Sequence, residues 1–286
     1  ILDKASVVLD FDVLGFSPRT LQRFRQILEL PHGILLVTGP TGSGKTTTLY
    51  TALQTLNTPG RKILTVEDPV EYQLEGINQI QAKPQINLTF AHALRAIVRQ
   101  DPDVIMIGEM RDLETAGIAV QSALTGHLVL STLHTNDAAG SITRLLDMGV
   151  DDYLLTSTIS GILAQRLVRL LCTHCRQPYP ALPELVEEMR LHRFTEARDI
   201  TLYQPVGCEH CSGTGYRGRA AIMEFLVMSD PLRRLVLKHA DSGELQMAAQ
   251  QEGMDTMYED GLRKAVTGLT TIEEVLRVTT QQEQEA

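Results

Sequence analysis

Gly39-Pro40-Thr41-Gly42-Ser43-Gly44-Lys45-Thr46 matches the phosphate-binding pattern G-x-x-x-x-G-K-[ST], and the rest of the chain is best interpreted outward from this loop. Residues 33–38 before it are typical of a buried strand, and residues 45–56 after it of a helix, which is the context the pattern requires. Glycines let backbone N–H groups approach phosphate oxygens, and the helix N-terminus adds partial positive charge. A chance glycine-rich turn is therefore a poor alternative.

The loop predicts a nucleotide site with defined roles for its side chains. Lys45 is expected to reach the β- and γ-phosphates, and the Thr46 hydroxyl is expected to bind Mg²⁺. The residues expected to bind ATP here are Gly39, Thr41, Gly42, Ser43, Gly44, Lys45, Thr46 and Thr47.

Strands and helices alternate on both sides of the loop. A helix is expected to start at Ser17-Pro18, since Ser suits the N-cap and Pro the first helical position. Further strands are predicted at 62–67, 104–107 and 128–133, a hairpin at 72–81 and helices near 90–98, 112–125, 137–148 and 152–168. Such alternation predicts an α/β fold with a parallel sheet covered on both faces.

Composition and segment character divide the 286 residues into four expected parts. Residues 1–30 are expected to be a linker or the remnant of a missing N-terminal domain, 31–170 the ATPase core, 171–220 a four-cysteine subdomain and 221–286 a helical C-terminal part. Helices are expected in the last part at 230–238, 242–251, 256–266 and 271–277. The sequence has no apolar run approaching 18 residues, so a transmembrane helix is not expected.

Acidic side chains follow two of the predicted strands. Glu109 comes directly after strand 104–107, at the sheet edge where ligands of parallel sheets bind, and is the candidate for activating the attacking water. The preceding residue is Gly108 rather than the usual Asp, so Mg²⁺ needs Thr46, water or another acid. That acid could come from Glu67, Asp68 and Glu71, although a solvated turn before a proline is the alternative.

Histidines and arginines supply further candidates. His134 follows strand 128–133 on the active-site side and could contact the γ-phosphate, whereas His127 stands at the opposite end. Arg95 and Arg99 stand four apart on one predicted helix and could neutralise phosphate charge. By spacing alone, a structural histidine and a solvated helical face are the commoner outcomes.

The four cysteines form two C-x-x-C pairs, Cys172–Cys175 and Cys208–Cys211. Two such pairs can present four thiolates tetrahedrally, which predicts a closed structural zinc site. Reduced thiols or a redox pair are the alternative, and a pair of pairs is the more specific pattern. His174 and His210 lie inside the pairs and are interpreted as bystanders, because four thiolates fill the coordination shell.

Together these motifs resemble the secretion ATPase superfamily, and with the paired cysteines they resemble the type II secretion ATPase E family (general secretory pathway protein E). The motifs that carry the resemblance are the phosphate loop, TVEDPVEY (65–72), LRAIVRQDPDVIMIGEMRD (94–112), TGHLVLSTLHTN (125–136), AQRLVRLLC (164–172) and GLTTIEEVLRV (268–278). The related pilus-assembly ATPases share much of this set, so a type IV pilus assembly ATPase is the alternative.

The resemblance implies a RecA-like core with a zinc-bearing insertion and a helical C-terminal part. It implies that Glu109 is the catalytic glutamate, that Glu67, Asp68 and Glu71 lie in an aspartate box, and that His127 and His134 lie in a histidine box. Arg95 and Arg99 would match arginines that precede the acidic strand. The implied cofactors are ATP, Mg²⁺ and Zn²⁺.

The resemblance also implies a cytoplasmic hexamer that associates peripherally with inner-membrane platform proteins and couples ATP hydrolysis to pseudopilus assembly and protein export. Family members carry N-terminal domains, and Ile1–Lys4 resembles the last strand of such a domain. We therefore expect weak ATPase activity and poor hexamer formation from this chain alone.

Two other classes remain as alternatives. A RecA-like nucleic-acid translocase would share the loop and sheet, but the net charge of -9 and the few aromatic residues disfavour nucleic acid as a partner. A nucleotide-gated scaffold would bind ATP without turning it over, and Glu109→Gln would separate it from an enzyme.

Overall fold

The computed structural model describes residues 9–280, and its centre is a seven-stranded sheet with the order β3-β2-β4-β5-β1-β6-β9. Neighbouring strands are parallel except β9, which is antiparallel to β6. The strands of this sheet are β1 (Gly33–Thr38), β2 (Ile63–Glu67), β3 (Asn78–Gln81), β4 (Val104–Ile107), β5 (Leu128–Leu133), β6 (Ile159–Leu171) and β9 (Tyr216–Val227). The predicted α/β fold with a mostly parallel sheet is confirmed.

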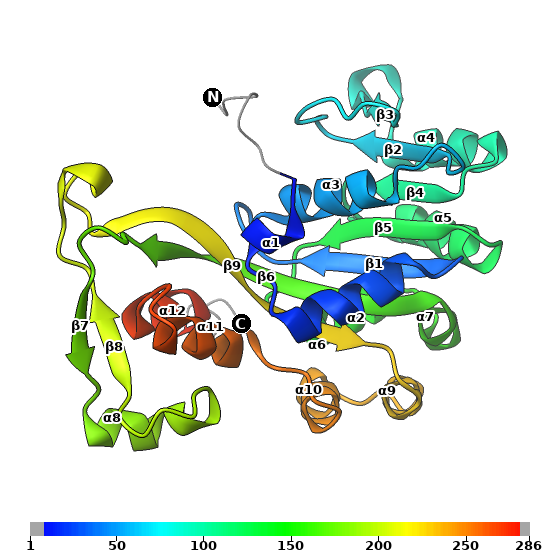
Figure 1. Cartoon of the computed structure of the whole chain (residues 1–286). Coiled ribbons are helices and arrows are strands. Elements are labelled where there is room, and N and C mark those ends of the chain that lie inside the picture. Colours follow the sequence, from blue (N-terminus) through cyan, green and yellow to red (C-terminus); the bar gives the residue numbers. More distant parts are fainter. Residues whose placement is uncertain (1–8, 281–286) are drawn as a thin grey trace.

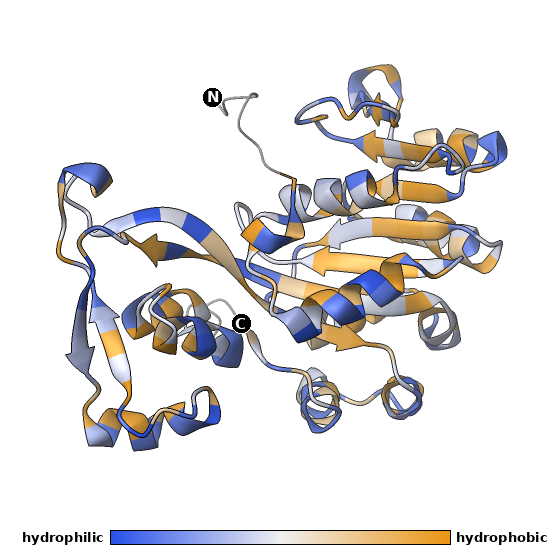
Figure 2. Cartoon of the chain, in the orientation of Figure 1, coloured by the Kyte–Doolittle hydropathy of each residue, from blue (hydrophilic) through white to orange (hydrophobic). Residues whose placement is uncertain are grey.

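Helices cover both faces of this sheet (Figure 1). One face carries α1 (Phe11–Leu14), α2 (Pro18–Leu28) and α3 (Lys45–Leu56). The other carries α4 (Phe90–Ile97), α5 (Leu113–Leu124), α6 (Ala138–Asp147), α7 (Asp152–Thr158), α9 (Asp230–Val236) and α10 (Ser242–Gln251). The central strands β1, β4 and β5 are therefore buried on both sides, and the hydropathy colouring shows them as largely apolar (Figure 2).

A second, smaller assembly lies beside the sheet. It consists of the antiparallel pair β7 (Gln177–Pro180) and β8 (Thr201–Gln204), with α8 (Pro183–Glu188). The helices α11 (Met257–Val266) and α12 (Ile272–Thr279) pack against it through an apolar cluster that includes Leu202 and Leu262. The strands β6 and β9 run out of the main sheet toward this assembly (Figure 1), so they connect it directly to the main sheet.

Local sequence signals account for several element boundaries. The Ser17 hydroxyl accepts from the Thr20 amide and Pro18 is the first residue of α2, as predicted. The Asp112 carboxylate accepts from the Thr115 amide at the start of α5. The predicted strands 33–38, 104–107 and 128–133 and the helix 45–56 have the observed bounds.

The predicted hairpin at 72–81 is wrong. Residues 78–81 form β3, which pairs in parallel with β2, so the segment before it is a connection back to the start of β2. Tyr72, Leu74 and Ile77 are apolar because they pack on the face of the sheet that also carries α3. The spacing of these apolar residues, which suggested a strand, reflects the packing of this connection on the sheet.

The predicted helix 152–168 is wrong in its second half. It ends at Thr158, and Ile159 begins β6, which lies between β1 and β9. A strand buried on both faces shows no alternation of polar and apolar residues, so periodicity alone does not separate it from a buried helix. β9 was not predicted, whereas the four helices expected after residue 229 are present as α9 to α12.

Candidate nucleotide site and four-cysteine cluster

The phosphate loop connects β1 to α3, and its glycines adopt backbone conformations and close contacts that other residues would not allow. Gly39 has φ of 143°, and a Cβ there would lie 2.4 Å from the carbonyl oxygen of Gln165. Gly44 caps α3 in the left-handed region with φ of 90°. The Lys45 ammonium donates to the carbonyl oxygens of Gly39 at 2.7 Å and Pro40 at 3.0 Å. Burial lowers the pKa of Lys45, and the nearby Glu109 carboxylate opposes that shift.

A cavity of about 490 Å³ lies over this loop, and the C-terminal ends of β2, β4 and β5 open into it. Among the predicted site residues, the following line it: Thr41, Gly42, Ser43, Gly44, Lys45, Thr46, Thr47, Glu67, Asp68, Glu71, Glu109 and His134. The structure therefore brings together the loop and acids that sequence reasoning placed at separate strand ends. The volume suits a small-molecule ligand such as a nucleotide.

Glu109 lies at the centre of the charged groups in this cavity. Its residue is only 9% exposed, and its carboxylate accepts from Arg111 at 2.5 Å and lies 3.3 Å from His134 Nε2. The hydrogen bond to Glu109 and its negative charge raise the pKa of the exposed Arg111, so the carboxylate has a cationic partner on one side and His134 on the other. Glu109 thus faces the same cavity as the phosphate loop, with its carboxylate in contact with one arginine and one histidine.

Glu67 is held differently from Glu109. It is 3% exposed and accepts from the hydroxyls of Tyr50 and Thr65 and from Gln79 Nε2 at 3.1 Å. Burial and the bond to Glu67 raise the pKa of Tyr50. Burial likewise raises the pKa of Tyr72, to about 12, and its ring packs edge-on against Tyr50 at 4.7 Å. Glu67 therefore supports the wall of the cavity through several hydrogen bonds.

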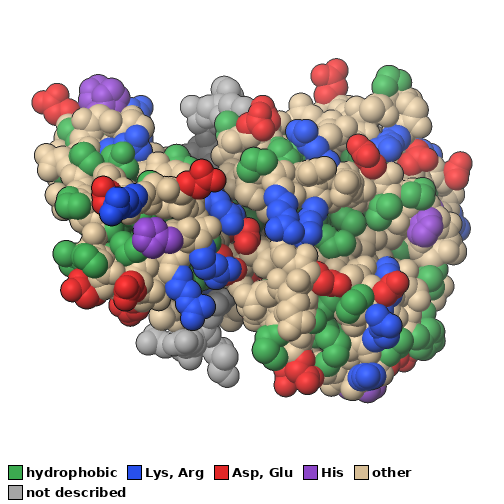
Figure 3. Space-filling view, turned by 60° about the horizontal axis from the view of Figure 1, so that its bottom comes forward, with side chains coloured by type: hydrophobic (Ala, Val, Ile, Leu, Met, Phe, Trp, Pro, Cys, Tyr) green, Lys and Arg blue, Asp and Glu red, His purple; other side chains and the backbone are tan. Residues whose placement is uncertain are grey.

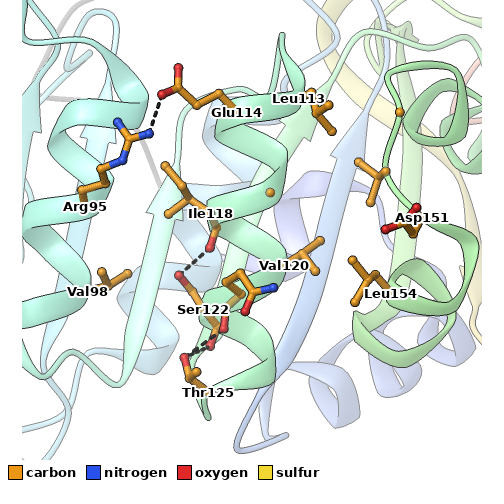
Figure 4. Close-up of a pocket in the computed structure, with 14 residues that line it drawn as sticks. Arg95, Val98, Leu113, Glu114, Ile118, Val120, Ser122, Thr125, Asp151 and Leu154 are labelled. Carbon is orange, nitrogen blue, oxygen red and sulfur yellow. Dashed lines mark hydrogen bonds and ion pairs between the residues drawn. The ribbon is translucent and has the colours of Figure 1, made fainter.

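Arg95, Arg99 and His127 lie away from this cavity, and Gly39, at the start of the loop, does not line it. Arg95 pairs with Glu114 at 2.5 Å in a separate surface groove between α4, α5 and α7 (Figure 4). Arg99 follows in the short turn after α4, and both arginines are exposed. His127 lies at the start of β5, the opposite sheet edge, where its Nδ1 is 2.8 Å from the Ser122 carbonyl oxygen.

Other residues reach the cavity without having been predicted. Arg111 follows Glu109 by two positions, and its place beside an acidic strand end could have been a signal. Leu167 and Arg219 come from β6 and β9, two strands that the sequence pattern did not reveal. Gln165 on β6 contacts the phosphate loop itself.

On the face of the molecule in Figure 3, Lys and Arg side chains gather near the middle while hydrophobic side chains are scattered.

The four cysteines converge at the junction between the two assemblies. Their Sγ atoms all lie within 4.8 Å of one another, with separations of 3.8 Å (Cys172–Cys208), 3.8 Å (Cys175–Cys211) and 3.7 Å (Cys208–Cys211). A tetrahedral Zn²⁺ with Zn–S bonds of about 2.3 Å separates its sulfurs by about 3.8 Å. The spacing of the sulfurs therefore fits a four-thiolate metal site.

Backbone donors support this cluster. The amide of Gly207 donates to Cys175 Sγ at 3.3 Å, and the amides of Cys208 and Gly215 donate to Cys211 Sγ at 3.2 Å each. Such donors stabilise thiolates, the form in which cysteine binds metals. The rings of His174 and His210 stack on each other at 4.0 Å outside the cluster, so neither is among its ligand atoms.

Curated relatives match nearly all of the chain. A type II secretion system protein E from Xanthomonas campestris pv. campestris is 67% identical over 279 residues, which is 98% of this chain and 49% of that protein. Its counterpart from Pectobacterium carotovorum subsp. carotovorum is 54% identical over 280 residues, 98% of this chain and 55% of that protein. The type IV pilus assembly ATPase PilB of Thermus thermophilus is 50% identical over 276 residues, 96% of this chain and 31% of that protein.

Solved structures share the fold. The pilus retraction motor PilT with bound ADP has a TM-score of 0.71 at 29% identity, covering 98% of this chain and 69% of PilT. The DotB ATPase of Legionella pneumophila has a TM-score of 0.67 at 23% identity, covering 95% of this chain and 65% of DotB, and is similar in fold.

The family model for the type II/IV secretion system protein matches residues 1–277. This match and the named relatives confirm the resemblance inferred from the motifs. The chain spans about half the length of the type II relatives it matches. The described residues include no helix long and apolar enough to cross a bilayer. By the extent of the family match, the chain belongs to the type II/IV secretion system protein family.

Proposed function

We propose that this chain is the ATP-hydrolysing part of a type II secretion motor. The observation that carries the proposal is the convergence of the phosphate loop with Glu109 and His134 in a single cavity. Family membership and the fold shared with named ATPases support it.

In this proposal the loop amides and Lys45 hold the phosphates, and the charge of Lys45 stabilises negative charge that develops during transfer. Glu109 orients the attacking water and accepts its proton, while Arg111 and His134 hold the carboxylate in place. Thr46 and the acids Asp68 and Glu71 are the residues that would hold Mg²⁺. When bound there, Mg²⁺ would neutralise negative charge on the phosphates.

Paired variants test the hydrolytic proposal. Lys45→Ala should abolish binding of ADP and ATP, because it removes the cation from the phosphate loop. Glu109→Gln should retain ADP binding but lower turnover by about 100-fold or more, since an amide cannot take the proton. Exposed Glu75→Gln is the control. If Glu109→Gln turns ATP over at the parent rate, Glu109 is not the base. If the longer, oligomerised protein shows no turnover, the nucleotide-gated scaffold is favoured instead.

The biological task follows from the relatives. The relatives named type II secretion system protein E, at up to 67% identity, support type II secretion as the task. From the resemblance of the motifs we propose that the longer protein drives pseudopilus assembly and protein export as a cytoplasmic hexamer docked on inner-membrane platform proteins. The pilus assembly ATPase PilB, at 50% identity, favours pilus assembly as the second candidate. Complementation of secretion-deficient and pilus-deficient strains by the longer protein separates the two: rescue of export alone supports the first.

The four cysteines would hold a structural zinc ion. The observation that supports this is the spacing of their sulfurs, 3.7 to 3.8 Å between the closest pairs, which matches a tetrahedral Zn²⁺ site. A site with four thiolates has no open position, so its metal would organise the chain rather than take part in hydrolysis.

A further inference from the structure

Gln165 lies beside the phosphate loop, although it belongs to a distant part of the sequence. It is on β6, which pairs in parallel with β1, and the register Thr38↔Ala164 brings residue 165 level with the start of the loop. Its side chain is buried, with the residue 1% exposed. The close approach of its backbone to Gly39 leaves no space for a Cβ at that glycine. Strand β6 therefore forms a wall against which the loop is packed.

The Gln165 side chain makes two hydrogen bonds to the segment that binds phosphate. Its Nε2 donates to the carbonyl oxygen of Ser43 at 2.7 Å, and its Oε1 accepts from the Thr48 hydroxyl at 2.8 Å. The orientation of the amide is fixed by chemistry, because a carbonyl oxygen only accepts and so must face the NH₂ group. The side chain thus connects the last turn of the loop to the first turn of α3.

The hydrogen bond from Gln165 to the Ser43 carbonyl also fixes the direction of the Gly44 N–H. The Ser43 carbonyl and the Gly44 amide belong to the same planar trans peptide, in which C=O and N–H point in opposite directions. Since the carbonyl faces Gln165, the Gly44 N–H faces away from β6, toward the cavity that Ser43 and Gly44 line. Gly44 lacks a Cβ and has φ of 90°, so this peptide would otherwise rotate readily.

We propose that Gln165 is a positioning residue that aims the Gly44 amide at the nucleotide phosphates. The proposal rests on the proposed ATP site but goes beyond the phosphate-loop motif, since the residue lies on another strand. Aligned amides bind an anion without reorganising at the moment of binding, whereas a peptide free to rotate loses part of that advantage. Loss of the Gln165 side chain should therefore weaken phosphate binding while leaving the chemical step on bound ATP little changed.

Binding of ADP and of inorganic tripolyphosphate to the 286-residue chain tests this inference. Gln165→Met keeps the size of the side chain but loses both bonds, and Gln165→Leu also loses both bonds without adding a charge near the phosphates. Both should raise Kd for each ligand by about tenfold, because the Gly44 amide is no longer held in one direction. Gln165→Leu, with a different side-chain shape, keeps the inference testable if Gln165→Met does not fold.

Thr48→Val is the matched control, because it also leaves a buried polar atom without a partner but does not touch the bond to Ser43. It should lower Tm to a similar extent as Gln165→Met and change Kd less than about threefold. Equal loss of affinity in Thr48→Val, or parent affinity in both Gln165 variants, would overturn the inference. If the parent chain bound neither ligand, the proposed ATP site itself would be overturned.

Discussion

At the residue scale, the two buried acids of the nucleotide cavity have different surroundings. Glu109 is held by an exposed arginine and a half-exposed histidine, both of which also line the cavity. Glu67 instead accepts from neutral donors, including the Tyr50 hydroxyl. Because the Glu67 carboxylate already accepts several hydrogen bonds from neutral donors, it is better suited to a structural role at the cavity than to accepting a proton. Both were expected to be catalytic, and the structure gives a physical reason to separate their roles.

Tyr50→Phe tests the supporting role of Glu67. The change removes one donor to the buried carboxylate, so the free energy of unfolding should fall by about 1–3 kcal/mol. Urea denaturation measures it, and exposed Tyr153→Phe is the matched control, expected to change stability little. An unchanged unfolding free energy in Tyr50→Phe would show that the hydrogen bond contributes nothing net.

At the element scale, one carboxylate joins the N-termini of two helices. Asp137 caps α6 by accepting from the Gly140 amide, and Thr256 caps α11 by accepting from the Glu259 amide. These caps do not bind the first backbone amide of either helix. The Glu224 carboxylate on β9 accepts a hydrogen bond from each of these amides, from Ala138 at 2.8 Å and from Met257 at 3.2 Å. The helix after His134 and a C-terminal helix are thereby tied to one strand.

The titration of Glu224 should appear in the stability of the protein. Burial raises the pKa of Glu224 to about 7, even though the two helix amides oppose the shift. The folded protein then keeps a proton that the unfolded chain releases, so the free energy of unfolding falls as pH rises toward about 7 and levels off above it. The full effect is about 3 kcal/mol, at 1.36 kcal/mol per pKa unit.

Glu224→Gln should remove this pH dependence because an amide does not ionise. The stability of the parent relative to this variant should decline by up to about 3 kcal/mol between about pH 5 and pH 8. Chemical denaturation across that range measures the difference, and exposed Glu75→Gln serves as the control for a surface carboxylate. A constant difference across the range would contradict the raised pKa.

At the scale of the whole molecule, the four-cysteine cluster lies where two assemblies meet. Cys172 follows the last residue of β6 directly, and Cys211 precedes β9 by a short turn. The same strands carry Gln165 and Arg219 to the nucleotide cavity. A metal at the cysteines would therefore fix the far ends of strands whose other residues shape the nucleotide site.

Metal removal tests this arrangement. The protein as purified should contain about one zinc ion per chain, and chelation should increase hydrogen exchange in β7 and β8, since a structural zinc site contributes folding energy directly. Cys208→Ser should reproduce the effect, and Ser212→Ala, an exposed neighbour, is the control. A metal-free protein with unchanged exchange after chelator treatment would rule out a structural zinc ion.

The sequence by itself determined the nucleotide-binding half of this protein. A glycine-rich loop, a lysine and acids after apolar runs predict the site because each signal is local: the loop needs glycine, and strands buried in a parallel sheet need continuous apolar residues. The positions of Glu109 and His134 followed from the rule that strand C-terminal ends share one edge. The spacing of the cysteine pairs likewise predicted that the four cysteines cluster together.

Only the tertiary structure decided which strand closes the sheet and which distant side chains reach the loop. The residues of β6 have helix-like composition and become a strand because β6 pairs with β1 along one edge and with β9 along the other. Gln165 and Arg219 are near the phosphate loop for that reason alone, and Arg95, Arg99 and His127 are kept from it by the same topology. Contacts between residues far apart in sequence depend on how the strands are ordered, and local patterns carry no information about that order.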